Sequence, residues 1–299
     1  MTLSTNVTQQ EEIETPPTSA FYANGHTDTG KIADYADESE DGRAVSEEEY
    51  WATYYEHPYF SYEWNNGILE EKPVSDFHNV MIYQWFVRLL EEYLAHHPVA
   101  VMVNLEMGFR LRLPKKTTIR KPDLFLVRHD NPITLALADH TFRGICDLCV
   151  EILSDSTKKE KERDTVVKKA EYATIGVHEY YILDDDVANL AFYRRNRQGD
   201  YEAMDLGAER IVRSAVLDGF QFRVDDLLRR PALIDLVHDD VYRHFVNLDY
   251  QVAQQVAQQE RQRAEEERQR ATFEYTRAER YAALLREHGI SLQDPDTQE

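Results

Sequence analysis

Apolar residues recur at helical spacing in three parts of the chain. The longest is residues 76–97, where the predicted helix follows a capping residue, Ser75, and carries an apolar stripe made of Ile82, Phe86, Leu89, Leu90 and Tyr93. A shorter helix over residues 46–57 opens with Ser46 and Glu49, the spacing of a capping box. A third helix runs from about residue 161 to 175. It is expected to end at Gly176, because glycine accepts the left-handed conformation that closes helices.

Short apolar segments between these helices predict strands. They are residues 99–107, 108–113, 122–127, 147–153 and 179–184. Two hairpins are expected, one over residues 61–71 with its turn at Asn66-Gly67 and one over residues 189–206 with its turn at Gln198-Gly199. Strands that alternate with helices are typical of an α/β domain. We expect a mixed β-sheet flanked by helices, with residues 100–106, 122–127, 148–153 and 179–184 in the sheet and the helix 161–175 packed on it.

The two ends differ from this middle part, so the pattern predicts three regions. Residues 1–44 have few large apolar side chains and are expected to form a disordered acidic arm. Residues 45–235 form the folded domain. Residues 236–299 form a helical tail in which Ala257, Ala264, Ala271 and Ala278 recur every seven residues and Leu285 follows in phase. This is the period of a coiled coil, but alanine is a weak seam residue, so a self-associating coil and a solvated single helix both remain open.

Composition narrows the class of protein. Of the 299 residues 42% are hydrophobic, which is enough for a substantial core. No apolar run approaches the roughly 18–20 residues that span a bilayer, and the first residues lack a signal-peptide pattern, so we expect a cytoplasmic protein with no membrane partner. Cys146 and Cys149 form a C-x-x-C pair, but the sequence has no second pair for a structural zinc site. We expect them to be reduced, buried thiols.

The net charge of −21 argues against nucleic acid as a partner, because nucleic acid favours basic surfaces. The distribution of the charge changes this conclusion. Residues 1–50 hold twelve acids against Lys31 and Arg43 and contribute nearly half of the net charge. Two basic stretches, residues 110–128 and 158–169, bracket Glu151. They are either ordinary solvated charges or the source of a local basic field around that residue.

Two carboxylates occupy positions that otherwise belong to strands of the core. Glu151 lies inside the apolar segment 148–153, and Asp123 directly follows Pro122 at a strand start. A carboxylate in a core is costly unless its charge is compensated, and two that come together repel unless a cation lies between them. Mg²⁺ suits such a pair because it prefers oxygen ligands. The alternative is an ordinary strand entry, where aspartate after proline is common.

The helix that follows offers a lysine for the same site. Asp164, Lys168 and Tyr172 are spaced four residues apart and share one helix face. Lys169 lies about a quarter turn away, and the small or apolar residues Val166, Ala170 and Ala173 place the expected core side nearer to it. Spacing alone therefore leaves the choice between the two lysines open.

These motifs together resemble one known family. Pro122-Asp123, then VEILSDST at 150–157, then D-x-x-x-K-x-x-x-Y at 164–172 and GVHEYYILD at 176–184 are similar to the Uma-type restriction endonucleases of the PD-(D/E)XK nuclease superfamily. The resemblance covers roughly residues 57–230 and implies the restriction-endonuclease-like fold. It also implies a Mg²⁺- or Mn²⁺-dependent endonuclease that hydrolyses DNA phosphodiester bonds.

The resemblance implies roles for particular residues. Asp123 and Glu151 would be the metal ligands, and Lys168 would be the catalytic lysine. The superfamily pattern has lysine two residues after the acid, but this chain has Leu153 there, and in the Uma-type family the following helix supplies the lysine. Auxiliary roles fall on Glu71, His78, Glu106 and Tyr172. An alternative interpretation stays open, in which an inactive nuclease fold recruits partners through its tail. A homodimer formed through the core or the C-terminal helix is also open.

Overall fold

The computed structural model describes residues 38–153 and 157–289. The predicted acidic arm therefore lies outside the described residues up to position 37, as do Ser154, Asp155 and Ser156 of the VEILSDST motif. The folded unit begins at Ser39. Its first residues pair with the hairpin that follows: the Gly42 amide donates to the Leu69 carbonyl and the Leu69 amide donates to the Arg43 carbonyl, each at 2.9 Å. The folded unit thus includes described residues that precede the predicted boundary at 45.

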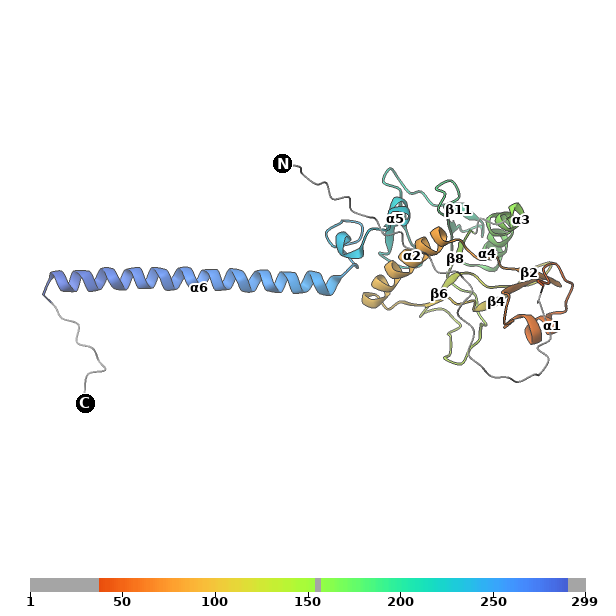
Figure 1. The fold of residues 1–299 in the computed structure, drawn as a ribbon, viewed down its shortest axis with the longest axis horizontal. Coiled ribbons are helices and arrows are strands. Elements are labelled where there is room, and N and C mark those ends of the chain that lie inside the picture. The colour runs from red at the N-terminus through yellow and green to blue at the C-terminus, as the bar shows by residue number, and fades with distance from the viewer. Residues whose placement is uncertain (1–37, 154–156, 290–299) are drawn as a thin grey trace, which may run out of the picture. The chain divides into compact units, whose positions relative to one another are not determined.

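The described chain is a mixed α/β fold (Figure 1). A six-stranded sheet has the order β11-β10-β9-β8-β6-β3. Its strands are β3 (Ala100–Val103), β6 (Leu124–Arg128), β8 (Leu148–Ile152), β9 (Glu179–Leu183), β10 (Ala191–Arg195) and β11 (Tyr201–Ala203). β8 and β9 run parallel, whereas β6 and β8 run antiparallel, so the sheet is mixed. It contains all four segments that the sequence placed in one sheet, and that prediction is confirmed.

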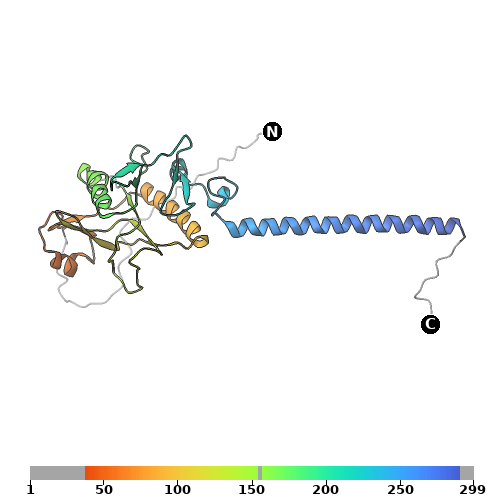
Figure 2. The ribbon, with the colours of Figure 1, turned by 180° about the vertical axis from the view of Figure 1, so that it is seen from behind.

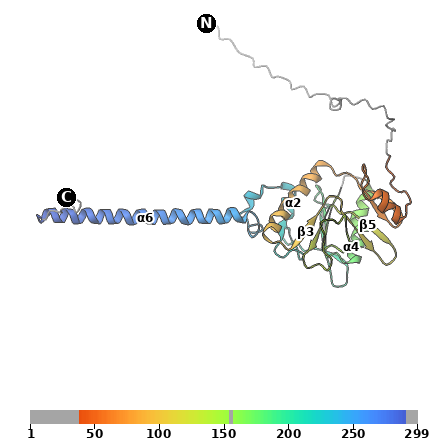
Figure 3. The same ribbon diagram turned by 90° about the horizontal axis from the view of Figure 1, so that it is seen from below.

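A second sheet of five strands has the order β2-β1-β5-β4-β7 (Figure 3 labels β3 and β5, one strand of each large sheet). Its strands are β1 (Tyr62–Asn65), β2 (Ile68–Glu71), β4 (Gly108–Arg112), β5 (Thr117–Arg120) and β7 (Thr141–Phe142). The predicted hairpin at Asn66-Gly67 is confirmed as β1–β2, with positive φ at both turn residues. β5 and β7 were not predicted. A small third sheet pairs β12 (Ile211–Arg213) with β13 (Gln221–Arg223).

Helices pack on both faces of the six-stranded sheet. The helices and helical turns of the described chain are α1 (Glu47–Glu49), the π-helical turn η1 (Tyr50–Tyr54), α2 (Phe77–His96), α3 (Lys158–Glu162), the π-helical turn η2 (Arg163–Lys168), α4 (Lys169–Ile175), α5 (Val224–Arg229), the 3₁₀ turn η3 (Leu233–Leu236) and α6 (Leu248–Glu287). Of these, α2 and α4 pack on opposite faces of the six-stranded sheet. The stripe of α2 forms one buried cluster with Leu124 and Val150 of the sheet. Phe125 and Cys149, which point to the other face, cluster with Tyr172 of α4.

Local details differ from the predictions in two places. Asp76, not Ser75, caps α2, because its carboxylate accepts from the amides of His78 and Asn79 at 2.8 and 3.1 Å. The helix predicted over 161–175 consists of α3, η2 and α4, and it ends at Gly176 with φ 105° as predicted. Both cysteines are free and buried, with their sulfur atoms 3.0 Å apart.

The core continues beyond the predicted domain boundary at residue 235. Six of the next eleven residues are buried in the cluster of α2, namely Leu236, Val237, Val241, Tyr242, Phe245 and Val246. The tail helix α6 begins only at Leu248 and runs for 40 residues without a buried side chain, as one uninterrupted helix (Figure 2). Among the described residues, no helix combines the length and the apolar character that crossing a membrane requires.

Candidate active site

Asp123 and Glu151 face each other across two neighbouring strands. β6 and β8 are antiparallel, with Leu124 opposite Val150 and Phe125 opposite Cys149. Continued by one residue, this register puts Asp123 opposite Glu151 on the α4 face of the sheet, where side chains in such pairs lie about 5 Å apart at Cβ. The Ile152 amide donates to Asp123 Oδ2 at 2.7 Å, which ties the start of β6 to the end of β8. The structure thus brings the two carboxylates together.

Glu151 is buried, and its ionised form is disfavoured. Its side chain is 2% exposed, and Oε1 accepts from the Tyr172 hydroxyl at 2.9 Å and lies 3.1 Å from Lys168 Nζ. Burial raises the pKa of Glu151 to about 8, against the opposing effect of Lys168 and with further repulsion from Asp164 and Asp123. A buried carboxylate with a raised pKa is typical of a functional site, and an added positive charge beside it would favour its ionised form.

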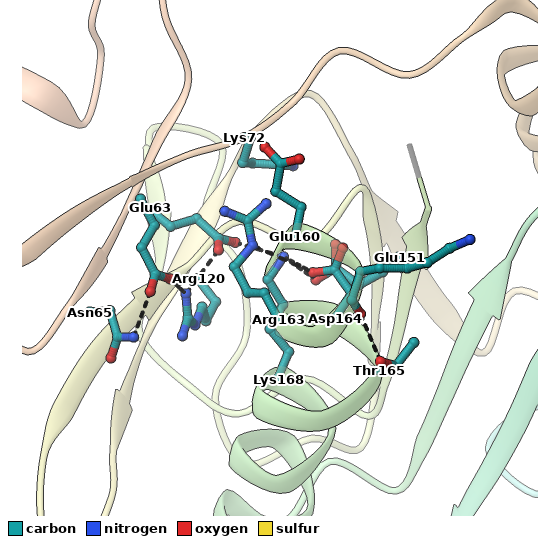
Figure 4. A network of polar contacts seen from close by, with 12 residues as sticks. Glu63, Asn65, Lys72, Arg120, Glu151, Glu160, Arg163, Asp164, Thr165 and Lys168 are labelled. Atoms are coloured by element: carbon teal, nitrogen blue, oxygen red, sulfur yellow. Dashed lines mark hydrogen bonds and ion pairs between the residues drawn. The ribbon is translucent and has the colours of Figure 1, made fainter. Parts of the chain in front are cut away.

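Of the two lysines that the sequence offered, Lys168 contacts Glu151 (Figure 4). Its ammonium is 1% exposed and lies 3.0–3.1 Å from three carboxylates, those of Glu63, Glu151 and Asp164. Burial alone would lower the pKa of Lys168, but these acids raise it above its ordinary value, so the amine is a fixed cation.

Lys169 lies elsewhere, 3.8 Å from the centre of the Tyr193 ring. The helix-face argument that favoured it was wrong, since Val166 is 57% exposed and Ala170 is exposed too. The buried face is the one that Asp164, Lys168 and Tyr172 share, at 6%, 1% and 0% exposure.

A buried cluster of ion pairs, which was not predicted from the sequence, holds Lys168 in position. Glu63 of β1 is fully buried and contacts both Lys168 and Arg120, the latter at 3.0 Å. Arg120 is also fully buried and reaches Glu171 at 2.7 Å and Glu70. Burial would raise the pKa of Glu63, but Lys168 and Arg120 hold it below its usual range. Glu63 is therefore an ionised acid that orients Lys168 toward Glu151.

A second lysine contacts Asp123. Lys72 is 7% exposed at its side chain, and its ammonium lies 3.0 Å from Asp123 Oδ1 and 3.4 Å from Glu106 Oε1. It also donates to the Lys121 carbonyl at 2.6 Å. Burial would lower the pKa of Lys72, but Asp123 and Glu106 raise it, so Lys72 is charged. The Asp123 side chain is 23% exposed, which leaves the open side of the carboxylate pair accessible.

The auxiliary residues fall into two groups. Tyr172 and Glu106 belong to the site through their contacts with Glu151 and Lys72. Glu71 and His78 do not contact the carboxylate pair. Glu71 lines a cavity of about 380 Å³ beside Arg163, and His78 is largely exposed, with Nδ1 3.8 Å from Asp185.

The donor set fits a hard dication. Within the described ranges no group of three or more His, Cys, Asp or Glu side chains is arranged to hold a metal ion, so the fit rests on Asp123 and Glu151. Mg²⁺ is often held by one or two carboxylates and fills its other positions with waters and phosphate oxygens. Two opposed carboxylates, of which one is buried and hard to ionise, would gain from such a charge between them.

Comparison with known proteins bears on the family of the chain. The model of the Uma2 family, described as "Putative restriction endonuclease", matches residues 47–225, more than half of the chain. The chain belongs to the Uma2 family. A solved structure, a putative nuclease belonging to DUF820 from Anabaena variabilis ATCC 29413, is 16% identical and is matched over 57% of this chain and 90% of that one with a TM-score of 0.46. No curated protein matches the chain.

Within this Uma2 chain, the substitution Glu151→Gln tests whether the pKa of Glu151 is raised. Between pH about 4.5 and about 8 the folded protein keeps a proton on Glu151 that the unfolded chain releases. In chelator, the stability of the wild type should therefore fall with rising pH across this window. Glu151→Gln removes this titration. The difference in melting temperature between the variant and the wild type should therefore rise in favour of the variant up to pH about 8 and stay constant above it. Melting curves of both proteins that run parallel through the whole window would contradict the raised pKa.

Proposed function

We propose that the protein is a Mg²⁺- or Mn²⁺-dependent endonuclease that hydrolyses DNA phosphodiester bonds and works in the cytoplasm. One observation carries the proposal: Asp123 and Glu151 stand opposite each other on β6 and β8, with the ammonium of Lys168 3.1 Å from Glu151. Membership of a family described as restriction endonucleases agrees with this chemistry.

In this proposal, some residues bind the metal ion and others provide charge or hold a neighbouring side chain in place. Asp123 and Glu151 would hold the ion, which when bound lowers the pKa of a coordinated water and offsets phosphate charge. Lys168, fixed between Glu63, Asp164 and Glu151, presents a positive charge where the attacking or departing oxygen becomes negative. Tyr172 orients Glu151 through its hydroxyl. Lys72 holds Asp123 in place and limits repulsion between the two acids.

Asp123→Asn tests the proposal, because it keeps the shape of the side chain and removes the charge that binds a dication. Wild type, Asp123→Asn and the exposed control Asp218→Asn should be compared on plasmid, linear duplex, single-stranded DNA and RNA, with Mg²⁺, Mn²⁺, Ca²⁺ or chelator. Loss of several kcal/mol of transition-state stabilisation should lower the cleavage rate of Asp123→Asn at least about a hundredfold. The control should cleave as the wild type does.

Melting curves give a second readout. Mg²⁺ should raise the melting temperature of the wild type and leave that of Asp123→Asn unchanged, since a ligand stabilises only the state that binds it. A wild type that shows neither a shift with metal nor cleavage of any of these substrates would refute the enzyme. The alternative, a catalytically inactive nuclease fold that recruits partners, would then gain support from α6, a 40-residue helix without a buried side chain and a candidate for homodimer contacts.

A further inference from the structure

A cavity large enough for a small ligand lies away from the carboxylate pair. A cavity of about 870 Å³ lies between β4, β7 and the end of α4, and we call it the arginine cavity after Arg110, Arg112 and Arg143, which line it. Cys146 and Asp147, just before β8, form its floor. Asp147 is four residues from Glu151, or about 13 Å along a strand, so the cavity is separate from the candidate active site.

Three guanidinium groups gather at this cavity with few acids to balance them. Arg110 and Arg112 are two residues apart on the exposed side of β4. β7 pairs with β4 in parallel, with Phe142 opposite Phe109, so Arg143 follows opposite Arg110. Like charges opposite each other on neighbouring strands are destabilising. Glu47 neutralises Arg110 at 2.6 Å, but no carboxylate of residues 38–153 or 157–289 forms an ion pair with Arg112 or Arg143.

The acid inside the cavity is already engaged. Asp147 Oδ2 accepts from the Arg128 amide at 2.8 Å and from Asn131 Nδ2 at 2.9 Å. The cavity therefore keeps an excess of positive charge in a chain whose net charge is −21. Guanidinium groups with free donors favour phosphate or carboxylate groups, which they bind in bidentate fashion.

An aromatic ring stands beside these donors. The two carboxylate oxygens of Glu47 hold Trp51 and Arg110 together: Trp51 Nε1 donates to Oε1 at 3.1 Å, and Arg110 contacts Oε2. Trp51 is partly exposed and lines the cavity with Phe142 and Ile133. A prepositioned indole next to a guanidinium suits a ligand that has a flat ring and an anionic group.

We propose that the arginine cavity binds a nucleoside phosphate, with the base on Trp51 and the phosphate on Arg112 and Arg143. The volume falls within the roughly 300–1,000 Å³ of small-ligand pockets. The ligand is either a free nucleotide or one nucleotide unit of a nucleic-acid strand, because both offer the same base and phosphate. The site goes beyond the proposed cleavage chemistry and shares no residue with it.

Fluorescence titration of the full chain tests the site. Trp64 and Trp85 are buried, at 7% and 4% exposure, so quenching on ligand addition reports mainly on Trp51. The probes are deoxyadenosine monophosphate, a short single-stranded oligonucleotide and inorganic pyrophosphate, each in chelator. Tighter binding of the monophosphate identifies a free nucleotide as the ligand, and tighter binding of the oligonucleotide identifies a strand.

Matched variants identify the residues that contact the ligand. Binding to Trp51→Ala is measured by calorimetry, because this variant lacks the indole whose fluorescence is followed. Arg112→Gln with Arg143→Gln should weaken both nucleotide probes about tenfold or more, as expected for loss of charge-assisted hydrogen bonds. The control pair Arg88→Gln with Arg197→Gln makes the same charge change at exposed positions outside the cavity and should stay within about twofold. Trp51→Ala should weaken the monophosphate about tenfold through lost stacking and leave pyrophosphate binding unchanged.

Three results would overturn the site. They are no binding of any probe to the wild type, equal weakening by the control pair, and equal weakening of pyrophosphate and monophosphate by Trp51→Ala. Asp123→Asn should bind all probes as the wild type does, so failure of the cleavage proposal and failure of this site are separable.

Discussion

Lys168→Ala should abolish cleavage of nucleic acid, whereas Lys169→Ala should retain most of the activity. Lys168 Nζ lies 3.0–3.1 Å from Glu63, Glu151 and Asp164, while Lys169 lies on the ring of Tyr193. Loss of a fixed charge aimed at the developing negative charge should lower the rate at least about a hundredfold. Cleavage rates of the two alanine variants, measured on the best wild-type substrate, check this.

The same change removes the partner of three buried or nearly buried acids. Breaking a buried ion pair from one side costs about 3–5 kcal/mol, so the melting temperature of Lys168→Ala should fall as well. Lys168→Arg keeps the charge and separates the two effects: it should restore most of the stability and only part of the rate, because the guanidinium cannot occupy the place of the ammonium. Equal rates for Lys168→Ala and Lys169→Ala would remove the lysine from the mechanism. The reverse ranking would assign the role to Lys169.

Arg120→Met should lower the free energy of unfolding by about 3–5 kcal/mol. Arg120 is fully buried between Glu63 and Glu171 and also contacts Glu70. Methionine fills the space but removes the cation that these carboxylates share, so that Glu63 retains only Lys168 and Glu171 only Lys116. Urea unfolding followed by circular dichroism measures the loss.

Arg229→Met is the matched control. Arg229 forms an exposed ion pair with Asp225 at 4.0 Å, and its removal should cost less than about 1 kcal/mol. If Arg120→Met loses no more than this control, the carboxylates around Arg120 are compensated by other groups, and Glu63 does not depend on Arg120 for its ionised state.

The fold was largely predictable because its strands and helices carry their own periodicity. The α2 stripe, the Asn66-Gly67 turn and the glycine at 176 each specify their element locally. β5 and β7 escaped prediction because they are short and carry no clear alternation of apolar and polar residues; β5 pairs with nearby β4 and distant β1, and β7 pairs with distant β4. Residues 236–246 were assigned to the tail, although six of them are buried in the cluster of α2.

The candidate site was predictable only in part. Asp123 and Glu151 stand out because each is an acid among apolar neighbours. Glu63 and Arg120 gave no such signal, since an acid in a hairpin and a basic residue at a strand end are ordinary on a surface. Their burial arises only when the second sheet packs against η2 and α4, which is a contact between segments about 50–100 residues apart. The choice between the two lysines depended on which helix face is buried, and Val166 and Ala170, which favoured Lys169 in the sequence, are exposed.

The cross-strand register of β6 and β8 has a consequence for how the family can vary in length. Asp123 and Glu151 meet because they occupy matching positions in an antiparallel pair, and the loop between the strands, residues 129–147, does not enter that match. Insertions in the loop can therefore lengthen the chain while the two acids stay opposed. A single residue deleted inside either strand has the reverse effect: it shifts one acid by one position and turns it to the α2 face, so that the sheet itself separates the pair. Length variants of this chain should thus accumulate between the strands and be absent from within them.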